Sequence, residues 1–441
     1  MRTADLLVIG GGPGGYETAA AAAARGEKVI LFERDRLGGT CLNRGCIPTK
    51  CLCASAKLLD DIRHASDLGI STSGTTVDFT AIKQRISEVT DTLRQDIAGA
   101  LSDVEIVNAE ATIGPGPSVV AAAETYTAPR IIIATGSAPA RLRIPGAETA
   151  LDSDAVLALD AVPESMVIIG GGVIGLEFAS VLNSFGCNIT VLEYCKEILP
   201  GFDRDIAKRL RGYLSRKGID IVTGAEVTAI ENGCRVTYIC KGKEKQVEAA
   251  TILTAVGRRP VLPSGLENAG VSLNARGFID TDSEFRAAPG IYAIGDVNGR
   301  CMLAHAASAQ GRVVLGHEVR LDIMPGVVFS NPECAMVGIT EETATVSGCE
   351  CIAVKVPYGA NGKAIASGES DGLIKLIVNK GDGTIAGCHC VGAHAADIVA
   401  EVTIAMNSGM SVGTLAHGTV HAHPTLSELL ATAATAAAAR L

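Results

Sequence analysis

Short apolar runs alternate with amphipathic stretches along most of the chain, which is the pattern of an α/β protein with parallel strands. Residues 6–9 read Leu-Leu-Val-Ile and end in glycines, which predicts a buried strand. An alanine-rich helix to about Ala24 and a second strand at 28–32 are predicted to follow. Residues 166–193 repeat this strand, helix, strand order. The pattern therefore predicts two α/β units of the same design.

The other segments are less regular. Two helices are expected between residues 51 and 100, separated by a polar loop at 71–76. Further strands are predicted at 104–120, 125–133, 251–255 and 290–297. From Met324 onward the pattern changes to strands of moderate length with one helix from Ala395 to about Ser408. This change predicts a third domain of a different type.

Each α/β unit carries the glycine spacing of a dinucleotide-binding turn. The glycines are Gly10, Gly12 and Gly15 in the first unit and Gly170, Gly172 and Gly175 in the second. The first glycine permits a tight turn, the second lets the backbone approach a pyrophosphate, and the third lets helix and strand pack closely. One such turn alone could belong to another α/β protein. Two of them predict two nucleotide cofactors with electron transfer between them.

An acid ends the second strand of each unit, at the same interval after the first glycine. These acids are Glu33 and Glu193, and a carboxylate at this place can accept hydrogen bonds from a ribose diol. In the second unit the carboxylate favours the free 2′-hydroxyl of NAD over the 2′-phosphate of NADP, although Lys196 lies nearby.

A cysteine pair lies in the segment from Gly38 to Lys50, Gly-Gly-Thr-Cys-Leu-Asn-Arg-Gly-Cys-Ile-Pro-Thr-Lys. On a regular helix the side chains of Cys41 and Cys46 would point apart, whereas a disulfide needs Cα atoms within roughly 7 Å. A bridge therefore requires a distorted turn, which Gly45 and Pro48 can supply. We hypothesise a redox-active dithiol beside an electron-carrying cofactor.

Polar residues follow other predicted strands. Residues 134–137 read Ala-Thr-Gly-Ser, a turn at which backbone can meet a cofactor or simply form a loop. Asp296 stands near the carboxyl end of a strand, where it can bind a polyol such as a ribityl chain or cap the next helix. His421 or His423 paired with Glu428 would form an oriented general base; a histidine held by its local turn is the alternative.

Composition narrows the class of protein. The 441 residues suggest about three domains, and 47% hydrophobic with 20% charged residues is globular. A net charge of -10 without a basic run disfavours nucleic acids and anionic membranes as partners, and the lack of a long apolar run predicts a cytoplasmic protein. Fourteen cysteines are too dilute for a secreted disulfide scaffold, so most are expected to be small buried hydrophobes. Three close pairs could suggest metal but lack further ligands, so no metal site is expected: Cys51 with Cys53, Cys349 with Cys351, and Cys388 with Cys390.

Together these motifs resemble those of the flavin-dependent pyridine nucleotide disulfide oxidoreductases, over essentially the whole chain and most closely in the lipoamide branch. The match is carried in order by 38–50, the two glycine turns, 134–137, 257–260, 295–296, 302–305 and 421–428. The resemblance implies an α/β fold with two Rossmann-like dinucleotide-binding domains, for FAD and NAD, and a C-terminal α+β dimerisation domain. The implied boundaries are 1–140 and 265–323 for the two segments of the FAD-binding domain, 141–264 for the NAD-binding domain and 324–441 for the dimerisation domain.

The resemblance also implies which residues form the site. On the FAD side these are Gly10, Gly12, Gly15, Glu33, Thr40, Lys50, Ala111, Thr135, Gly136, Ser137, Asp296, Met302, Leu303, Ala304 and His305. On the NAD side they are Gly170, Gly172, Gly175, Glu177, Glu193 and Gly257. Cys41 is expected to contact substrate and Cys46 the flavin, with His423 as base and Glu428 as its orienting partner. Lys50, paired with Glu177, is expected to approach the flavin.

The resemblance implies oxidation of dihydrolipoamide to lipoamide with reduction of NAD⁺ to NADH. The substrate would be borne by a separate lipoyl carrier protein of a 2-oxoacid dehydrogenase or glycine-cleavage complex. The active site would be shared in a homodimer, with the base supplied by the other subunit and an interface from about Asn331 onward.

Several alternatives remain open. Glutathione- and trypanothione-type reductases would prefer NADP, against Glu193, and the former tend to have a ring-bearing gate where Val173 stands. Mercuric reductase would be expected to carry a cysteine pair at its C-terminus, where this chain has alanines and threonines. Outside the class, the chain could be a non-catalytic nucleotide-binding redox sensor, or Cys41, Cys46, Cys51 and Cys53 could hold zinc. Ala109, Ala111 and Gln310 depart from the family pattern and put the local loops and adenine contacts in doubt.

Overall fold

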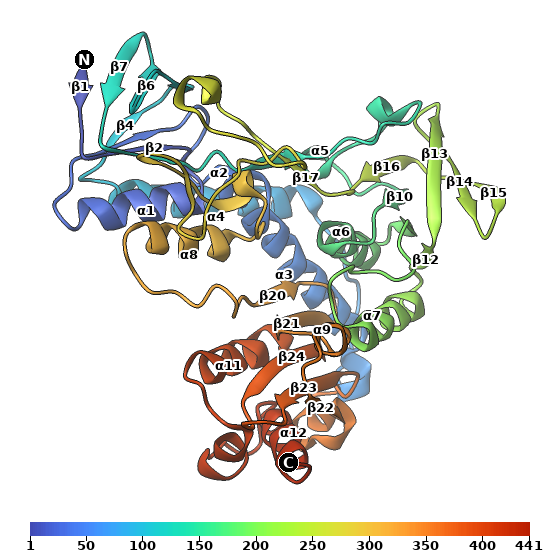
Figure 1. The fold of residues 1–441 in the computed structure, drawn as a ribbon. Helices are drawn as coiled ribbons and strands as arrows, with labels where there is room; N and C mark the ends of the chain where they lie inside the picture. Colours follow the sequence, from blue (N-terminus) through green and yellow to red (C-terminus); the bar gives the residue numbers. More distant parts are fainter.

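The computed structural model describes residues 1–441 and contains three bodies, each built on its own main sheet. In Figure 1 the first body lies at the upper left, the second at the right and the third at the bottom. The chain leaves the first body for the second and then returns, because β19 (Ile291–Ala293) pairs with β8 (Arg130–Ile133). The first body is therefore assembled from two separate segments of the chain.

The main sheet of the first body has six strands in the order β18-β19-β8-β2-β3-β4. Its other strands are β18 (Arg286–Ala288), β2 (Leu6–Ile9), β3 (Val29–Phe32) and β4 (Glu105–Val107). Every residue of β2 and β3 is buried, which explains their continuous apolar sequences. Helices α1 (Pro13–Ala23) and α8 (Ala304–Val314) lie side by side under this sheet (Figure 1).

Three helices of the first body lead from the sheet to the second body. They are α2 (Gly39–Arg44), α3 (Cys46–Arg63) and α4 (Phe79–Ala100), with a 3₁₀ turn at Ala65–Leu68. The two helices predicted between 51 and 100 are confirmed as α3 and α4, although α3 begins earlier, at Cys46. Helix α3 packs on both α4 and α6 (Val173–Ser184) of the second body.

The prediction of two long strands at 104–120 and 125–133 was wrong. Beyond β4 the chain forms β5 (Thr112–Ile113), β6 (Ser118–Ala121), β7 (Glu124–Thr127) and then β8. Ala122 and Ala123 both have positive φ angles, 50° and 63°, so they form a tight turn that pairs β6 with β7. Strands β5 to β7 join β1 (Arg2–Thr3) in a separate small sheet. This turn falls between the two predicted strands, whereas the breaks at 108–111, 114–117 and 128–129 interrupt them.

The second body has a four-stranded parallel sheet in the order β12-β11-β10-β16. Its strands are β10 (Ser165–Ile169), β11 (Asn188–Glu193), β12 (Asp220–Thr223) and β16 (Thr251–Thr254). Its helices, besides α6, are α5 (Ser153–Ala158) and α7 (Arg204–Arg216). A second, antiparallel sheet of this body consists of β13 (Ala225–Glu231), β14 (Arg235–Cys240) and β15 (Lys243–Glu248). Two crossing segments, β9 (Ser137–Pro139) and β17 (Arg258–Pro260), pair with each other between the first and second bodies.

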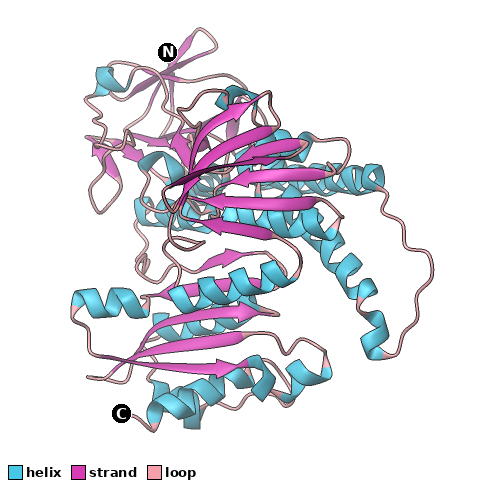
Figure 2. Ribbon diagram, turned by 90° about the vertical axis from the view of Figure 1, so that its right-hand side faces the viewer, coloured by secondary structure: helices cyan, strands magenta, loops and turns pink.

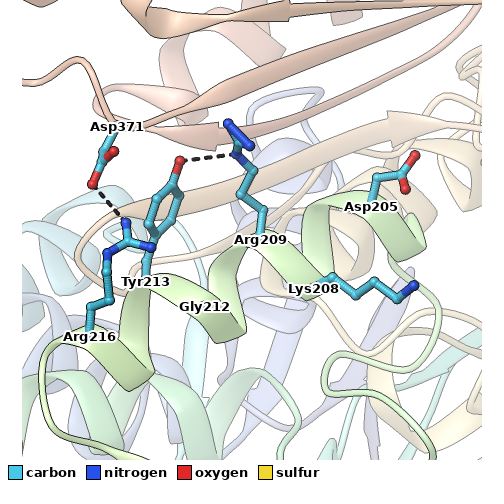
Figure 3. Close-up of a pocket in the computed structure, with 7 residues that line it drawn as sticks. All are labelled: Asp205, Lys208, Arg209, Gly212, Tyr213, Arg216 and Asp371. Carbon is cyan, nitrogen blue, oxygen red and sulfur yellow. Dashed lines mark hydrogen bonds and ion pairs between the residues drawn. The ribbon is translucent and has the colours of Figure 1, made fainter.

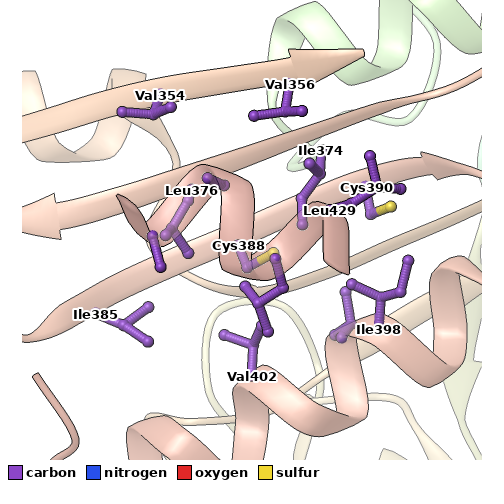
Figure 4. Close-up of a cluster of buried hydrophobic side chains, with 14 of the residues drawn as sticks. Val354, Val356, Ile374, Leu376, Ile385, Cys388, Cys390, Ile398, Val402 and Leu429 are labelled. Atoms are coloured by element: carbon purple, nitrogen blue, oxygen red, sulfur yellow. The ribbon is translucent and has the colours of Figure 1, made fainter. Parts of the chain in front are cut away.

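The third body has an antiparallel sheet in the order β20-β21-β24-β23-β22. Its elements are β20 (Gly326–Val328), β21 (Glu333–Gly338), α9 (Glu341–Ser347), β22 (Cys351–Pro357), α10 (Gly362–Ala366), β23 (Leu373–Asn379), β24 (Ile385–Gly392), α11 (Ala395–Asn407) and α12 (Glu428–Ala438). Figure 4 shows side chains of β22, β23 and β24 packed with Ile398 and Val402 of α11 and Leu429 of α12. In Figure 2 this sheet lies below the larger group of strands and helices, next to the C-terminus.

Short helical turns complete the fold, at Ala147–Thr149, Leu266–Ala269, Gly295–Asn298, Tyr358–Ala360 and Thr414–Gly418. None of the helices combines the length and the apolar character that crossing a membrane requires.

Candidate active site

Both glycine turns have the geometry that binds a pyrophosphate. A Cβ at Gly15 would overlap the carbonyl oxygen of Gly10, and one at Gly175 would overlap that of Gly170, so close packing of helix and strand requires glycine. A Cβ at Gly172, in contrast, would meet no atom within 4 Å, and one at Gly12 would meet only Gly39 Cα at 3.9 Å. Each turn thus leaves open space directly over the start of its helix.

The helices that begin at these turns have no side-chain cap. Gly12 is the N-cap of α1 and Gly172 the N-cap of α6, so the first N–H groups of both helices face the open space. Free N–H groups and the positive end of the helix dipole favour a phosphate. The two turns therefore fit the pyrophosphates of two dinucleotides.

The acid of each unit also supports its own glycine turn. Glu33 accepts hydrogen bonds from the backbone N–H of Gly11 and of Asp35, both at 2.7 Å. Glu193 accepts the equivalent bonds from Gly171 and Cys195, at 2.5 and 2.6 Å. The two acids are nearly buried, with 8% and 6% exposed. Each carboxylate is thereby fixed beside its glycine turn, and this structural role was not visible in the sequence.

The cysteine pair spans the break between α2 and α3. Cys41 lies in α2 and Cys46 is the first residue of α3, while Gly45 breaks the helix with φ −150° and ψ −114°. A Cβ at Gly45 would come within 2.9 Å of the carbonyl oxygen of Thr40, so the break leaves little room for a side chain at this position. Pro48 lies inside the first turn of α3, where proline is tolerated.

The two thiols, both free, differ in acidity because they share a hydrogen bond. The bond from Cys41 lowers the pKa of Cys46 to about 7, and the positive charge of Lys50 contributes in the same direction. The same bond, with burial, raises the pKa of Cys41. Cys46 is therefore the sulfur that carries the thiolate.

Lys50 is held by residues from two distant parts of the chain. Its Nζ lies 2.8 Å from both carboxylate oxygens of Glu177 on α6. It also lies 4.4 Å from the ring centroid of Phe329, whose N–H donates to Glu177 at 2.9 Å. Glu177 is 8% exposed and Lys50 31%, so the ammonium group keeps an open side next to the Cys46 end of α3. The sequence did not suggest Phe329.

Helix α3 is fixed at its other end by Asp60. Its Oδ2 accepts hydrogen bonds from Ser184 Oγ at 3.0 Å, Lys217 Nζ at 2.9 Å and Asn331 Nδ2 at 2.8 Å. These partners come from the second body and from the start of the third. The helix that carries Cys46 and Lys50 is thus anchored to all three bodies, through a residue that no sequence motif marked.

The turn at 134–137 meets Asp296 where the first two bodies join. Ser137 Oγ donates to Asp296 at 2.5 Å and Thr135 Oγ1 donates to the carbonyl of Val261 at 2.5 Å, while Gly136 has a φ of 72°. Arg258, next to Gly257, donates to Ser137 Oγ at 2.6 Å and to its carbonyl at 2.8 Å. Asp296 caps neither the 3₁₀ turn in which it lies nor α8. Arg258 is a further site residue that sequence reasoning did not single out.

Residues 302–305 provide a third open helix start. Leu303 is the N-cap of α8 without a side-chain bond, Ala304 is its first residue, and Met302 is 42% exposed. The His305 ring contacts the carbonyl oxygen of Pro325 at 2.8 Å. The backbone of this segment, more than its side chains, can therefore face a cofactor.

The structure shows the surroundings of two residues that depart from the family pattern, Gln310 and Ala111. Gln310 is buried and accepts hydrogen bonds from Gly295 N–H and Asn298 Nδ2, both at 2.8 Å, so it holds the turn that carries Asp296. The side chain of Ala111 is buried in the core of the first body. Only its backbone can face an adenine.

The two histidines near the C-terminus have different partners. His423 Nδ1 lies 3.0 Å from Glu428 Oε1, and its side chain is 81% exposed. Hydrogen bonds from His423 and from the N–H of Thr425 hold the pKa of Glu428 below its usual range. His421 instead contacts Glu401 at 2.8 Å and is 7% exposed. The exposed, oriented imidazole of His423 is the one that can act as a base on a substrate.

The structure does not bring this histidine to the cysteine pair within one chain. In Figure 1, α2 lies in the upper part of the molecule and α12, which begins at Glu428, lies at the bottom. The predicted site residues therefore form two groups, one around the dithiol and one around His423.

An open groove along α7 belongs to neither group. Its wall is formed by Arg209, Tyr213 and Arg216 of α7 together with Asp371 (Figure 3). Arg209 donates to the hydroxyl of Tyr213 at 3.1 Å, and Arg216 pairs with Asp371 at 2.8 Å. Lys208 also lines the groove, and no residue of either glycine turn does.

No cluster of three or more histidine, cysteine or acidic side chains has a geometry that could hold a metal ion. Cys388 and Cys390 are fully buried in the core of the third body (Figure 4).

The chain belongs to the pyridine nucleotide-disulphide oxidoreductase family, as its two nucleotide sites and its dithiol indicate. The family model matches residues 4–311, and the model of the family's dimerisation domain matches residues 324–434. Proteins of this family use FAD and NAD(H). The expected family, cofactors and α/β fold class with a dimerisation domain are confirmed.

Among its relatives are dihydrolipoyl dehydrogenases. The chain is 40% identical to those of Geobacillus stearothermophilus and Bacillus subtilis (strain 168), over 98% of this chain and 95% of each relative. A similar solved structure is the HOCl-induced flavoprotein disulfide reductase RclA from Escherichia coli, with a TM-score of 0.86 and 30% identity over 98% of this chain and 99% of that one.

Proposed function

We propose that the protein oxidises dihydrolipoamide to lipoamide and reduces NAD⁺ to NADH, as a homodimer. The observation that carries this proposal is the unequal dithiol: Cys46 has a pKa of about 7 beside Lys50, and Cys41 has a raised pKa. The near-40% identity to dihydrolipoyl dehydrogenases over the full chain supports the choice of substrate.

Dithiol oxidation starts from the disulfide form of Cys41 and Cys46. His423 of the partner subunit takes a proton from one substrate thiol, and Glu428 keeps its Nε2 free by holding Nδ1. The substrate thiolate attacks Cys41, the Cys41–Cys46 bond breaks, and Cys46 leaves as a thiolate. A sulfur with a pKa of about 7 is a good leaving group, and Lys50 stabilises its charge.

The second substrate thiol completes the exchange. It loses its proton to solvent and attacks the substrate sulfur that is bound to Cys41, which closes the lipoamide ring and releases Cys41 with the electron pair. His423 returns a proton to Cys41, whose raised pKa favours the thiol. The chain is then in the reduced form that the structure shows, with both cysteines free, and the lower pKa of Cys46 favours the thiolate on that sulfur.

Bound FAD would supply the acceptor for the electron pair of the dithiol and the hydride donor for NAD⁺. We infer that Gly12, Glu33 and Asp296 hold FAD at the first turn, and that Gly172 and Glu193 hold NAD at the second. Glu193 selects NAD, because its buried carboxylate would face the 2′-phosphate of NADP. Lys50 and Glu177 join the two sites.

A shared active site is the arrangement that these positions support. His423 is exposed and lies just before α12, which is far from α2 in the molecule (Figure 1). The dimerisation domain provides a surface for a second copy. We further infer that the substrate is a lipoyl group on a separate carrier protein of a 2-oxoacid dehydrogenase or glycine-cleavage complex. The cytoplasmic location expected from the sequence stays a prediction, which cell fractionation would test.

One alternative has its own support. The similarity to a flavoprotein disulfide reductase at 30% identity favours reduction of another disulfide at the expense of NAD(P)H. Comparing NAD⁺-linked dihydrolipoamide oxidation with NADPH-linked disulfide reduction distinguishes the two activities, since only the first requires the NAD selectivity of Glu193.

A further inference from the structure

A second pair of thiols lies in contact outside the catalytic centre. The sulfurs of Cys349 and Cys351 are 3.0 Å apart. Cys351 opens β22 in the third body, whereas the catalytic pair belongs to the first body. Both thiols are partly exposed and free.

The local fold explains this contact. Helix α9 ends at Gly348, which has a φ of 69°, and the N–H of Cys349 returns to the carbonyl of Ala344. The chain then enters β22, an edge strand of its sheet. In extended backbone, side chains two positions apart share one face, so the two thiols turn toward each other and the exposed Glu350 turns away.

The other close cysteine pairs lack this combination. Cys388 and Cys390 have the same spacing but are fully buried in a hydrophobic core. Cys51 and Cys53 lie on α3, where residues two positions apart point in different directions. Of these three close pairs, only Cys349 and Cys351, at the start of β22, combine contacting sulfurs with access to solvent.

We propose that Cys349 and Cys351 form a second redox site, which small-molecule disulfides oxidise reversibly to an intramolecular disulfide. This activity goes beyond the proposed oxidation of dihydrolipoamide and does not depend on it. The two sulfurs contact each other, and no further histidine, cysteine or acidic side chain lies close enough to complete a metal site. This arrangement favours a disulfide over a bound metal ion, because thiolate metal sites such as zinc sites require more donors.

The exchange proceeds in two balanced steps. The Cys349 thiolate attacks one sulfur of the small disulfide; the disulfide bond breaks, and one small thiolate leaves and takes up a proton. Cys351 then loses its proton and attacks the Cys349 sulfur, so that a second small thiol leaves. Both cysteines are oxidised and the small disulfide is reduced to two thiols.

The order of attack follows from the environment of Cys351. Burial, and then the hydrogen bond to Cys349, raise the pKa of Cys351 to about 12. Cys349 is therefore the first nucleophile and Cys351 the resolving thiol. A ring that encloses one residue constrains the unfolded chain very little and is strained, so the disulfide is expected to be easily reduced again.

Mass spectrometry of the full-length FAD-loaded enzyme in glutathione buffers tests the proposal. After incubation at graded ratios of reduced to oxidised glutathione, the protein is denatured, alkylated and digested with trypsin. The peptide 321–355 contains Cys334 in addition to Cys349 and Cys351. We expect three alkyl groups on this peptide in reduced buffer and one, on Cys334, in oxidised buffer, with full recovery of three on return to reduced glutathione.

Two controls keep the result specific. A Cys351→Ser variant is expected to stop at a glutathione adduct on Cys349. The peptide 381–440, which carries the buried Cys388 and Cys390, is expected to stay doubly alkylated in all buffers. Three alkyl groups on peptide 321–355 throughout, a stable glutathione adduct in the wild type, or equal oxidation of the buried pair would each overturn the proposal.

Discussion

The ammonium group of Lys50 lies 2.8 Å from both carboxylate oxygens of Glu177, and this ion pair connects the two nucleotide-binding units. Lys50 is on the same helix as Cys46, one turn further along, and Glu177 is on the helix that starts at the second glycine turn. The pair therefore places one positive charge where the helix that carries Cys46 meets the helix that starts at the second glycine turn.

Replacing Lys50 with methionine should make Cys46 less acidic. The lysine charge helps to hold the pKa of Cys46 at about 7, so its loss raises that pKa and lowers the thiolate fraction at neutral pH. We expect alkylation of the reduced enzyme by iodoacetamide at pH 7 to slow by about fivefold, because a shift of about one pKa unit from about 7 lowers the thiolate fraction from about one half to about one tenth. Lys57→Met, on the exposed part of the same helix, should leave the rate unchanged. Equal rates in Lys50→Met and the wild type would contradict the role given to Lys50.

The glycine turns predict opposite effects of alanine at two neighbouring positions. Gly172→Ala adds a methyl group to open space at an ordinary φ of −80°, so the unfolding free energy should change by no more than about 1 kcal/mol. The same methyl group blocks the approach of a pyrophosphate, and NAD⁺ binding should weaken by about tenfold or more, as measured by calorimetry.

Gly175→Ala should instead destabilise the protein, because its Cβ would overlap the carbonyl oxygen of Gly170. A loss of about 2 kcal/mol or more in chemical denaturation is expected. If Gly172→Ala bound NAD⁺ like the wild type, the second turn would not be the pyrophosphate site.

Glu193→Gln should weaken the preference for NAD. The carboxylate accepts two backbone hydrogen bonds next to the ribose position, and a neutral amide removes the charge that disfavours a 2′-phosphate. We expect kcat/KM for NAD⁺ to fall by about tenfold or more, with a smaller or no loss for NADP⁺. Glu197→Gln, whose side chain pairs with Arg211 on α7, serves as the matched control. An equal fall in kcat/KM for NAD⁺ and NADP⁺ would mean that Glu193 supports the glycine turn but does not distinguish the two nucleotides.

Subunit complementation should show whether His423 acts across the dimer. His423→Ala and Cys41→Ser are each expected to reduce dihydrolipoamide oxidation by about 100-fold or more, since one removes the base and the other the attacked sulfur. A heterodimer of the two variants, purified through two different tags, retains one intact site if the site is shared. About half the wild-type activity is then expected. A heterodimer as inactive as its parents would place His423 and Cys41 of one chain in the same site.

Local patterns along the chain were sufficient to predict the fold class and the chemistry, because each strand, glycine turn and strand-end acid is encoded within a few residues. The contact between Lys50 and Glu177 was expected only through family resemblance, since 127 positions separate the two residues. Phe329, Arg258 and Asp60 could not be found this way. Each acts through contacts between bodies, and such contacts leave no periodic signal.

The strands between residues 104 and 133 show where local reasoning fails. The first predicted strand is interrupted at 108–111, which contain neither glycine nor proline, so the usual marks of a break are absent there. The breaks at 114–117, Gly-Pro-Gly-Pro, and at Pro129 do carry such marks, but the apolar pattern around them suggested continuous strands. The separation of His423 from Cys41 was expected only through family resemblance, because a sequence does not itself show which surfaces a second copy completes.

Two initial rates show whether the protein is a dihydrolipoamide dehydrogenase or a reductase of another disulfide. The purified, FAD-loaded enzyme is assayed for NAD⁺-linked oxidation of dihydrolipoamide and for NADPH-linked reduction of glutathione disulfide, at equal concentrations of enzyme. We predict that the first rate exceeds the second by on the order of 100-fold or more. A faster NADPH-linked reduction of the disulfide would contradict it.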